Sequence, residues 1–143
     1  MSKIEAAVNW TVGIAQDDSH GYDQADRWGE YGDYDCSSLL ISAWQSAGVP
    51  VKDSGATYTA NMYNAFLKCG FEDVSEQVNL ATGDGLQRGD VLLNHVEHTS
   101  MYIGDNRIVE AQYSETQSAF GYAGDQTGKE IWVRNYYNFP WNC

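Results

Sequence analysis

Three residues of this chain have side chains that together could carry out nucleophilic acyl transfer: Cys36, His98 and Glu110. A cysteine thiolate attacks carbonyl carbons, and a histidine can remove and return a proton near neutral pH. A carboxylate can fix the tautomer and orientation of that histidine. The chemistry requires a fold that brings the three together, because they lie far apart in the sequence.

Cys36 lies in residues 34–39 (YDCSSL), where the sequence predicts the start of a helix. The unpaired N–H groups of a helix N-terminus stabilise a thiolate, and they can also stabilise an oxyanion. A small buried thiol is the alternative, since most free cysteines are structural. Cys69 and Cys143 are too widely spaced from Cys36 to indicate a disulfide framework or a CxxC metal site.

His98 is the candidate base, and it opens a predicted strand over residues 98–103. Alternation along the strand places His98 on the same face as Ser100 and Tyr102. An exposed strand histidine without a catalytic role is the alternative. His95, in the preceding loop, is the weaker candidate.

Glu110 lies in the next predicted strand, residues 107–112, and is the candidate that orients the histidine. If a three-residue loop follows Ile103, Ser100 opposes Glu110 and His98 becomes its diagonal neighbour. Diagonal Cβ atoms lie about 7–8 Å apart, within reach of a glutamate side chain.

A two-residue loop would instead pair Met101 with Glu110 and turn Glu110 to the opposite face. The assignment of Glu110 therefore depends on the hairpin register. Gln112, on the same face of the strand, is the second candidate for the residue that orients the histidine. An ordinary solvated carboxylate is the alternative interpretation of Glu110.

The elements that must position these residues change in character near residue 70. Before it, apolar residues recur at helical spacing; after it, short segments bounded by Gly, Asp or Asn favour strands. Helices followed by strands predict an α+β fold with an antiparallel sheet. We predict helices at 3–15, 36–47 and 59–70, and strands at 71–74, 90–93, 98–103, 107–112 and 129–134.

Composition restricts the class of partner. The 143 residues include 8 Lys and Arg against 20 Asp and Glu, a formal net charge of −12, which argues against nucleic acid and anionic membranes. No apolar run approaches the ~18 residues of a membrane span, and the N-terminus lacks the apolar core of a signal peptide. An apolar content of 43% predicts one globular domain.

Four motifs in this order resemble the NlpC-type and CHAP-type peptidoglycan hydrolases, above all the catalytic domains of phage endolysins: residues 34–38, 88–93, 98–104 and 107–111. The resemblance covers most of the chain. It implies a reduced papain-like fold, with N-terminal helices packed on a small antiparallel sheet, as one catalytic domain over residues 1–143. It also implies that Cys36 is the nucleophile, His98 the base and Glu110 the third polar residue, where the family often has His, Asn or Gln.

The implied activity is cleavage of a peptidoglycan amide by a thiol mechanism, for phage-induced host lysis. The bond would lie in the stem peptide or cross-bridge, or at the N-acetylmuramoyl-L-alanine link. The alternatives are a non-catalytic module of the same fold that binds wall peptides or a metal, and an acyltransferase with the same Cys–His pair.

Further residues are expected to line the substrate groove. By position in the family motif, these are Asp35, Ser37 and Tyr34, with Ser38 where the family usually has Gly. Trp28 would pack against glycan or peptide, although burial against the first helix is as plausible. The aromatic cluster at Tyr136, Tyr137, Phe139 and Trp141 has two readings: it stacks on substrate, or it closes the core of the sheet.

No cofactor is expected, although one loop is a weak candidate for a calcium site. Asp17, Asp18 and Asp23 lie in an acidic loop, and some CHAP-type enzymes hold calcium in a comparable loop. Carboxylate oxygens suit Ca²⁺, but the spacing is not that of an EF-hand. A solvated loop is the favoured interpretation.

The acidity also predicts how the domain reaches its substrate. Anionic wall polymers should repel a domain of charge −12, so we expect weak wall binding without a wall-binding module or partner subunit. We expect synthesis in the host bacterial cytoplasm without a signal peptide and action on the wall after release. The sequence leaves open that residues 1–143 were trimmed from a longer chain with a C-terminal wall-binding module.

Overall fold

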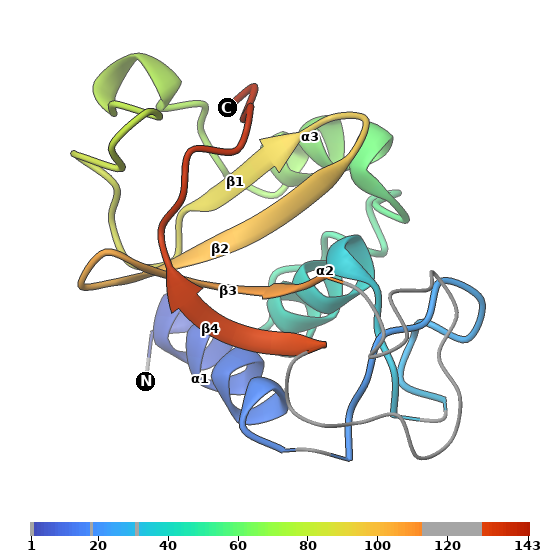
Figure 1. The fold of residues 1–143 in the computed structure, drawn as a ribbon. Coiled ribbons are helices and arrows are strands. Elements are labelled where there is room, and N and C mark those ends of the chain that lie inside the picture. Colours follow the sequence, from blue (N-terminus) through green and yellow to red (C-terminus); the bar gives the residue numbers. More distant parts are fainter. Residues whose placement is uncertain (1, 18, 31, 113–129) are drawn as a thin grey trace.

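The computed structural model describes every residue except 1, 18, 31 and 113–129 (Figure 1). The described residues form an α+β fold that confirms the predicted class. Its helices are α1 (Lys3–Ala15), α2 (Cys36–Ser46), α3 (Thr59–Lys68) and the short 3₁₀ helix η1 (Ser75–Gln77). Its strands are β1 (Val91–Asn94), β2 (His98–Gly104), β3 (Arg107–Ala111) and β4 (Ile131–Asn135), paired antiparallel in the order β1-β2-β3-β4.

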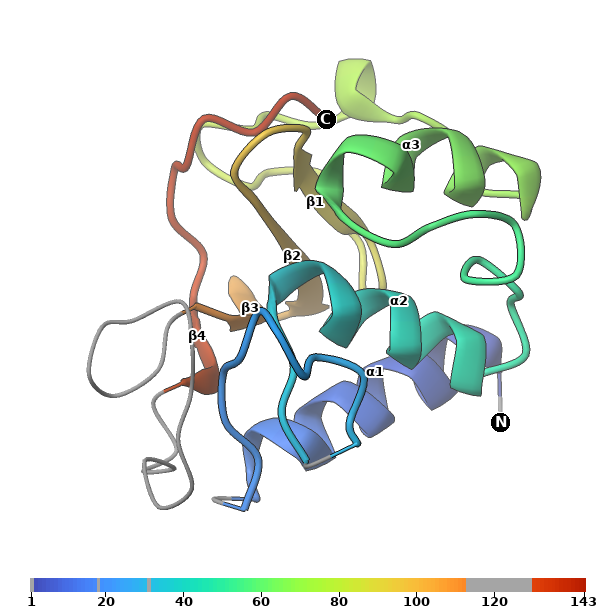
Figure 2. The ribbon, with the colours of Figure 1, turned by 90° about the vertical axis from the view of Figure 1, so that its right-hand side faces the viewer.

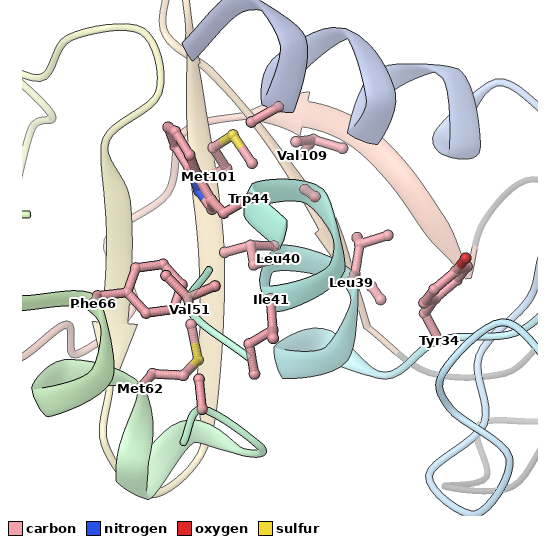
Figure 3. Packing of buried hydrophobic residues seen from close by; sticks show 14 of the residues in the cluster. Tyr34, Leu39, Leu40, Ile41, Trp44, Val51, Met62, Phe66, Met101 and Val109 are labelled. Atoms are coloured by element: carbon pink, nitrogen blue, oxygen red, sulfur yellow. The ribbon is translucent and has the colours of Figure 1, made fainter. Parts of the chain in front are cut away.

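Helix α2 is the central element of the core. It packs against α1 and α3 on its sides and against β2 and β3 of the sheet (Figures 2 and 3). Leu39, Leu40 and Ile41 are fully buried, and so is Ala43. Burying one aliphatic side chain of this size contributes about 1.5–3 kcal/mol, so the position of α2 in the fold is strongly determined. The residue that begins α2 is thereby fixed relative to the sheet.

The hairpin between β2 and β3 has an unexpected turn. Gly104 pairs with Arg107, so the loop contains two residues, Asp105 and Asn106, with φ of 53° and 60°. Positive φ at both central positions is the geometry of a type I′ turn. The predicted three-residue loop is therefore wrong.

A β-bulge in β2 compensates for the short loop. The pairing shifts between Tyr102 and Gly104, and beyond the shift Met101 pairs with Val109. The extra residue in the bulge restores the register that a three-residue loop would have given. Glu110 consequently lies on the predicted face.

One predicted strand is absent: residues 71–74 contain no strand. Phe71 instead packs its ring against Trp44 and Phe66, with ring centroids 4.8 Å apart in both pairs. The apolar character of this segment serves the interface with α2 and α3 rather than the sheet. Part of the last predicted strand, residue 129, lies outside the described residues.

The segment after β4 crosses back to β1, where Leu93 N–H donates to the Cys143 carbonyl and Asn142 N–H donates to the Leu93 carbonyl, each at 2.8 Å (Figure 1). On the way it covers a second apolar cluster that contains Leu92, Tyr102, Ile108 and Trp141. The aromatic residues near the end of the chain therefore do close a core. Among the described residues, no helix is both long and apolar enough to cross a membrane.

Candidate active site

A pocket of about 420 Å³ opens where the N-terminus of α2 meets the start of β2. The two candidate catalytic residues that begin these elements, Cys36 and His98, both line the pocket. Its other lining residues are Tyr22, Gln24, Glu97, Gln112, Tyr137 and Phe139. The pocket thus combines a thiol, an imidazole and several aromatic and amide side chains in one concave surface, as small-molecule and peptide sites generally do.

Cys36 is the first residue of α2, as predicted, and its side chain is partly exposed. Burial raises the pKa of the thiol to about 12, with a further contribution from the charge of Asp35. The backbone N–H groups of Thr99, Ser37 and Cys36 act in the opposite direction and lower this pKa. The thiol therefore carries its proton at neutral pH, and attack by sulfur requires a base.

His98 is held between the sheet and the C-terminal aromatic residues. Its ring stacks on Trp141 at 5.9 Å between centroids and meets Phe139 edge-on at 5.5 Å. Its Nε2 atom contacts Oε2 of Glu110. Because Glu110 occupies Nε2, Nδ1 is the nitrogen left to exchange a proton in the pocket.

Glu110 has no solvent exposure, so the interpretation as a solvated strand carboxylate is wrong. Its Oε2 atom accepts hydrogen bonds from Ser100 Oγ at 2.7 Å and from the Tyr137 hydroxyl at 3.1 Å. Arg134 Nη1 lies 3.6 Å from Oε1. Burial alone would raise the pKa of Glu110, but the contacts with His98, Ser100 and Tyr137 outweigh it and hold the pKa below its ordinary value. Glu110 is therefore an ionised partner of His98.

The other two histidines lie elsewhere. His95 packs its ring against Tyr63 at 5.6 Å, and His20 Nδ1 contacts the Gly32 carbonyl oxygen at 2.6 Å. Neither lines the pocket of Cys36. Gln112, the second candidate for the orienting residue, does line it, whereas Glu110 makes the contact with His98.

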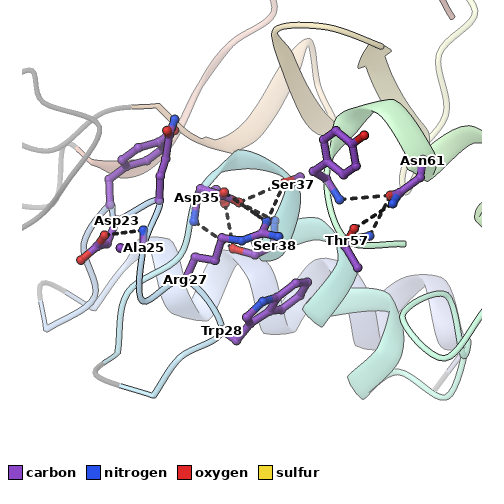
Figure 4. Close-up of polar contacts among 12 residues, drawn as sticks. Asp23, Ala25, Arg27, Trp28, Asp35, Ser37, Ser38, Thr57 and Asn61 are labelled. Atoms are coloured by element: carbon purple, nitrogen blue, oxygen red, sulfur yellow. Dashed lines mark hydrogen bonds and ion pairs between the residues drawn. The ribbon is translucent and has the colours of Figure 1, made fainter. Parts of the chain in front are cut away.

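Asp35, Ser37 and Ser38 form a polar network that begins α2 (Figure 4). Ser38 N–H donates to Asp35 Oδ1 at 2.8 Å, and Asp35 N–H donates to Ser38 Oγ at 2.9 Å. This reciprocal pair is a capping box. Arg27 Nη1 lies 3.2 Å from Asp35 Oδ2 and donates to Ser37 Oγ at 3.3 Å. All three residues are buried, and they hold the helix start rather than line the pocket.

Tyr34 and Trp28 are also not among the residues that line the pocket. Tyr34 is buried, with its ring edge-on to Trp10 at 5.6 Å. Trp28 is partly exposed, and its ring centre lies 3.9 Å from Lys52 Nζ and 4.7 Å from the Arg27 guanidinium. Figure 4 shows Trp28 close to Arg27. A role of these residues in substrate binding stays a prediction.

Two of the three residues in the candidate calcium loop have local partners. Asp17 Oδ1 accepts from Ser19 N–H at 3.0 Å, and Asp23 Oδ1 accepts from Ala25 N–H at 2.7 Å. Asp18 lies outside the described residues. Within the part of the chain that is described, no group of three or more His, Cys, Asp or Glu side chains could hold a metal ion. Calcium binding stays untested.

Residues 2–109 match the model of a family described as the endolysin-like domain. The chain belongs to the endolysin-like domain family. The match covers α1 to β3 and includes Cys36, but it stops one residue before Glu110 and leaves out β4 and the C-terminal aromatic segment.

One protein resembles this chain in sequence and another in fold. This endolysin-like domain is 29% identical over 117 residues to the peptidoglycan endopeptidase RipA of Mycolicibacterium smegmatis, a match that covers 80% of this chain and 20% of RipA. It thus spans about a fifth of the length of that relative. The P60 domain of antigen MAP1204 from M. avium subspecies paratuberculosis shares the fold, with a TM-score of 0.56 and 17% identity over 93% of this chain and 85% of that one. The resemblance read from the motifs is confirmed for family and fold.

Several residues of the site in this endolysin-like domain escaped sequence reasoning. Tyr22, Gln24 and Glu97 line the pocket, and Arg134 supports Glu110. Tyr137 was named from the sequence as part of the aromatic cluster, but its contact with Glu110 was not predicted. Glu97 directly precedes the predicted base, which is a usable indication of its place. The sequence predicts the strand that contains Arg134 but not the strand with which it pairs, so nothing in the sequence places Arg134 near Glu110.

Proposed function

We propose that this endolysin-like domain hydrolyses an amide bond of peptidoglycan with Cys36 as the nucleophile. The observation that carries the proposal is the contact between His98 and the ionised Glu110 at the edge of the pocket that Cys36 lines. Family membership and a relative that is a peptidoglycan endopeptidase support the substrate class. They favour a bond in the stem peptide or cross-bridge over the muramoyl-alanine link.

In the proposed mechanism His98 is a general base and then a general acid. His98 Nδ1 accepts the Cys36 proton as sulfur bonds to the carbonyl carbon, and N–H groups at the start of α2 face the oxyanion. The C–N bond then breaks, and His98 gives the proton to the leaving amine. Water attacks the thioester as His98 takes a proton from it. The C–S bond breaks as His98 returns that proton to sulfur, which regenerates the Cys36 thiol and the neutral His98 and releases the carboxyl product.

Glu110 assists both halves of this cycle without giving up its own charge. It accepts the Nε2 proton of His98, which fixes the neutral tautomer with Nδ1 free to act as a base. When His98 is protonated, Glu110 stabilises the imidazolium. The high pKa of the Cys36 thiol makes this base essential, because little thiolate exists at neutral pH before proton transfer.

We further infer a role in phage-induced host lysis, with action on the cell wall after release from the host cytoplasm. The charge of −12 supports dependence on a wall-binding module or partner subunit, since anionic wall polymers repel the domain. Addition of salt should then improve wall binding of the isolated domain, because screening weakens this repulsion.

Digestion of purified peptidoglycan, with mass spectrometry of the products, tests the proposed activity. A new peptide amine would identify an endopeptidase, and a new muramoyl-lactyl end an amidase. We expect Cys36→Ala to abolish product formation. Cys69→Ser is the matched control, because Cys69 is a partly exposed thiol whose Sγ atom contacts Ser54 Oγ at 3.3 Å away from the pocket. Full activity of Cys36→Ala would reject the mechanism, and binding without any products would favour a non-catalytic module.

A further inference from the structure

The geometry points to Arg134 and Tyr137 as positioning residues that hold Glu110 in its charged form and in contact with His98. This inference rests on the proposed function, in which Glu110 assists His98. Both residues lie outside the residues matched by the endolysin-like family model, which end at residue 109. They belong to β4 and to the segment that follows it.

Strands on both sides of β3 bring side chains to Glu110. On one side of β3, Ser100 of β2 hydrogen-bonds to Glu110, and His98 lies two residues further along the same strand. On the other side, Trp132 of β4 pairs directly with Glu110, and Arg134 lies two residues further along β4. His98 and Arg134 are thus diagonal neighbours of the same carboxylate from opposite strands.

The two carboxylate oxygens of Glu110 have different partners. Oε2 is shared by His98, Ser100 and the Tyr137 hydroxyl, whereas Oε1 has no hydrogen-bond partner among the described residues and lies 3.6 Å from Arg134 Nη1. The Arg134 guanidinium also lies 4.1 Å from the centre of the Tyr137 ring. Arg134 therefore acts on Glu110 by its charge and by holding the tyrosine that donates to Oε2.

The buried charge of Glu110 needs a cation throughout the catalytic cycle. A carboxylate without solvent exposure is costly unless a cation accompanies it. His98 supplies that cation only while it is protonated, and a general base must be neutral before it acts. An arginine is charged at every working pH. Arg134 therefore compensates Glu110 in the part of the cycle in which His98 is neutral.

The other titratable groups near this pair provide no substitute cation. The thiol of Cys36 and the carboxylate of Glu97 line the pocket with His98, and the carboxylate of Asp35 faces Cys36 from the start of α2. Among the described residues that line the pocket or contact Glu110, Arg134 is the permanent cation. Its removal should leave the His98–Glu110 pair with an excess of negative charge.

The test compares Arg134→Met, Arg134→Lys and Tyr137→Phe with the matched control Arg107→Met. Arg107 is an exposed cation on β3, so its removal changes the net charge equally without contact with Glu110. We expect Arg134→Met to lower kcat by about tenfold with little change in KM, because base catalysis is impaired and Arg134 does not line the pocket. Tyr137→Phe should lower kcat in the same way, and its KM should change as well, because Tyr137 lines the pocket. We expect the acid limb of the pH profile to move to higher pH, since the pair retains its proton longer. Arg134→Lys should restore most of both quantities.

A second readout is independent of turnover: NMR titration of the His98 ring in the Cys36→Ala background. We expect Arg134→Met to make the ring retain its proton to higher pH, and Arg107→Met to leave the titration unchanged. Tyr137→Phe keeps the aromatic packing and serves if Arg134→Met fails to fold. The inference is overturned if Arg134→Met matches Arg107→Met in both readouts, or if Arg134→Lys behaves as Arg134→Met. A shifted His98 titration in a protein that never cleaves peptidoglycan would retain the inference and reject the proposed function.

Discussion

Ser100 Oγ donates a hydrogen bond of 2.7 Å to Glu110 Oε2 across the β2–β3 hairpin. This contact shows that the two side chains share a face of the sheet. The same face carries His98, two residues before Ser100, and His98 Nε2 contacts the same carboxylate oxygen. The hairpin register therefore decides whether the chain has a histidine with an anionic partner or two unrelated polar residues.

Removal of the charge of Glu110 tests this relationship. We expect Glu110→Gln to lower kcat by about 10²-fold or more, because the amide can present its N–H to His98 and favour the wrong tautomer. KM should change little, since Glu110 is not among the residues that line the pocket. Steady-state kinetics on a soluble wall fragment measure both constants. Glu76→Gln, at an exposed position on η1 away from the pocket, is the control for the same loss of one negative charge, and equal loss of activity in both variants would contradict a specific role of Glu110.

Alkylation of Cys36 tests the need for His98. Burial and the charge of Asp35 raise the pKa of the thiol to about 12, so without a base the sulfur stays protonated at neutral pH. We expect iodoacetamide to modify Cys36 in the wild type near pH 7 but in His98→Ala only as the pH approaches that value. Peptide mass spectrometry reports modification of each cysteine. His95→Ala is the matched control and should react as the wild type does, and fast alkylation in His98→Ala at pH 7 would contradict the interpretation.

Acid unfolding tests the ionisation of Glu110. Its pKa in the folded state is lowered by His98, Ser100 and Tyr137 in spite of burial, whereas an unfolded glutamate titrates near pH ~4.3. The ionised carboxylate therefore contributes stability above about pH 4.3, and this contribution is lost as the pH falls through the lower folded-state pKa. We expect the difference in urea midpoint between wild type and Glu110→Gln to shrink between pH 6 and pH 3. Glu76→Gln, at an exposed position on η1, should show no such trend.

The capping box at the start of α2 gives a prediction about stability. Ser38→Ala removes the oxygen that accepts from Asp35 N–H in a fully buried position. We expect a loss of about 1–2 kcal/mol in the free energy of unfolding, measured by urea denaturation. Ser46→Ala near the end of the same helix is the control, since its hydroxyl only donates back to the Ala43 carbonyl and alanine favours helix. Equal stability of the two variants would mean that the box does not anchor the helix.

Much of the fold was predictable because local chemistry determines it. α1 and α2 begin at Lys3 and Cys36, where the apolar spacing predicts them, and alternation places His98 and Ser100 on one face of β2. These features depend on neighbours within a few residues. The segment at residues 71–74 was mistaken for a strand because its apolar residues pack on helices, which local pattern does not distinguish from packing in a sheet.

By itself the sequence determined the nucleophile candidate at the start of a helix, the base at the start of a strand and the family to which the chain belongs. The tertiary structure decided the rest. The two-residue loop alone would turn Glu110 to the opposite face of the sheet, and the bulge in β2 restores the register. Which of these two hairpin geometries is more stable depends on side chains that pack against the hairpin from other elements. Arg134 and Tyr137 reach Glu110 only because β4 pairs with β3, a long-range contact that no local spacing specifies.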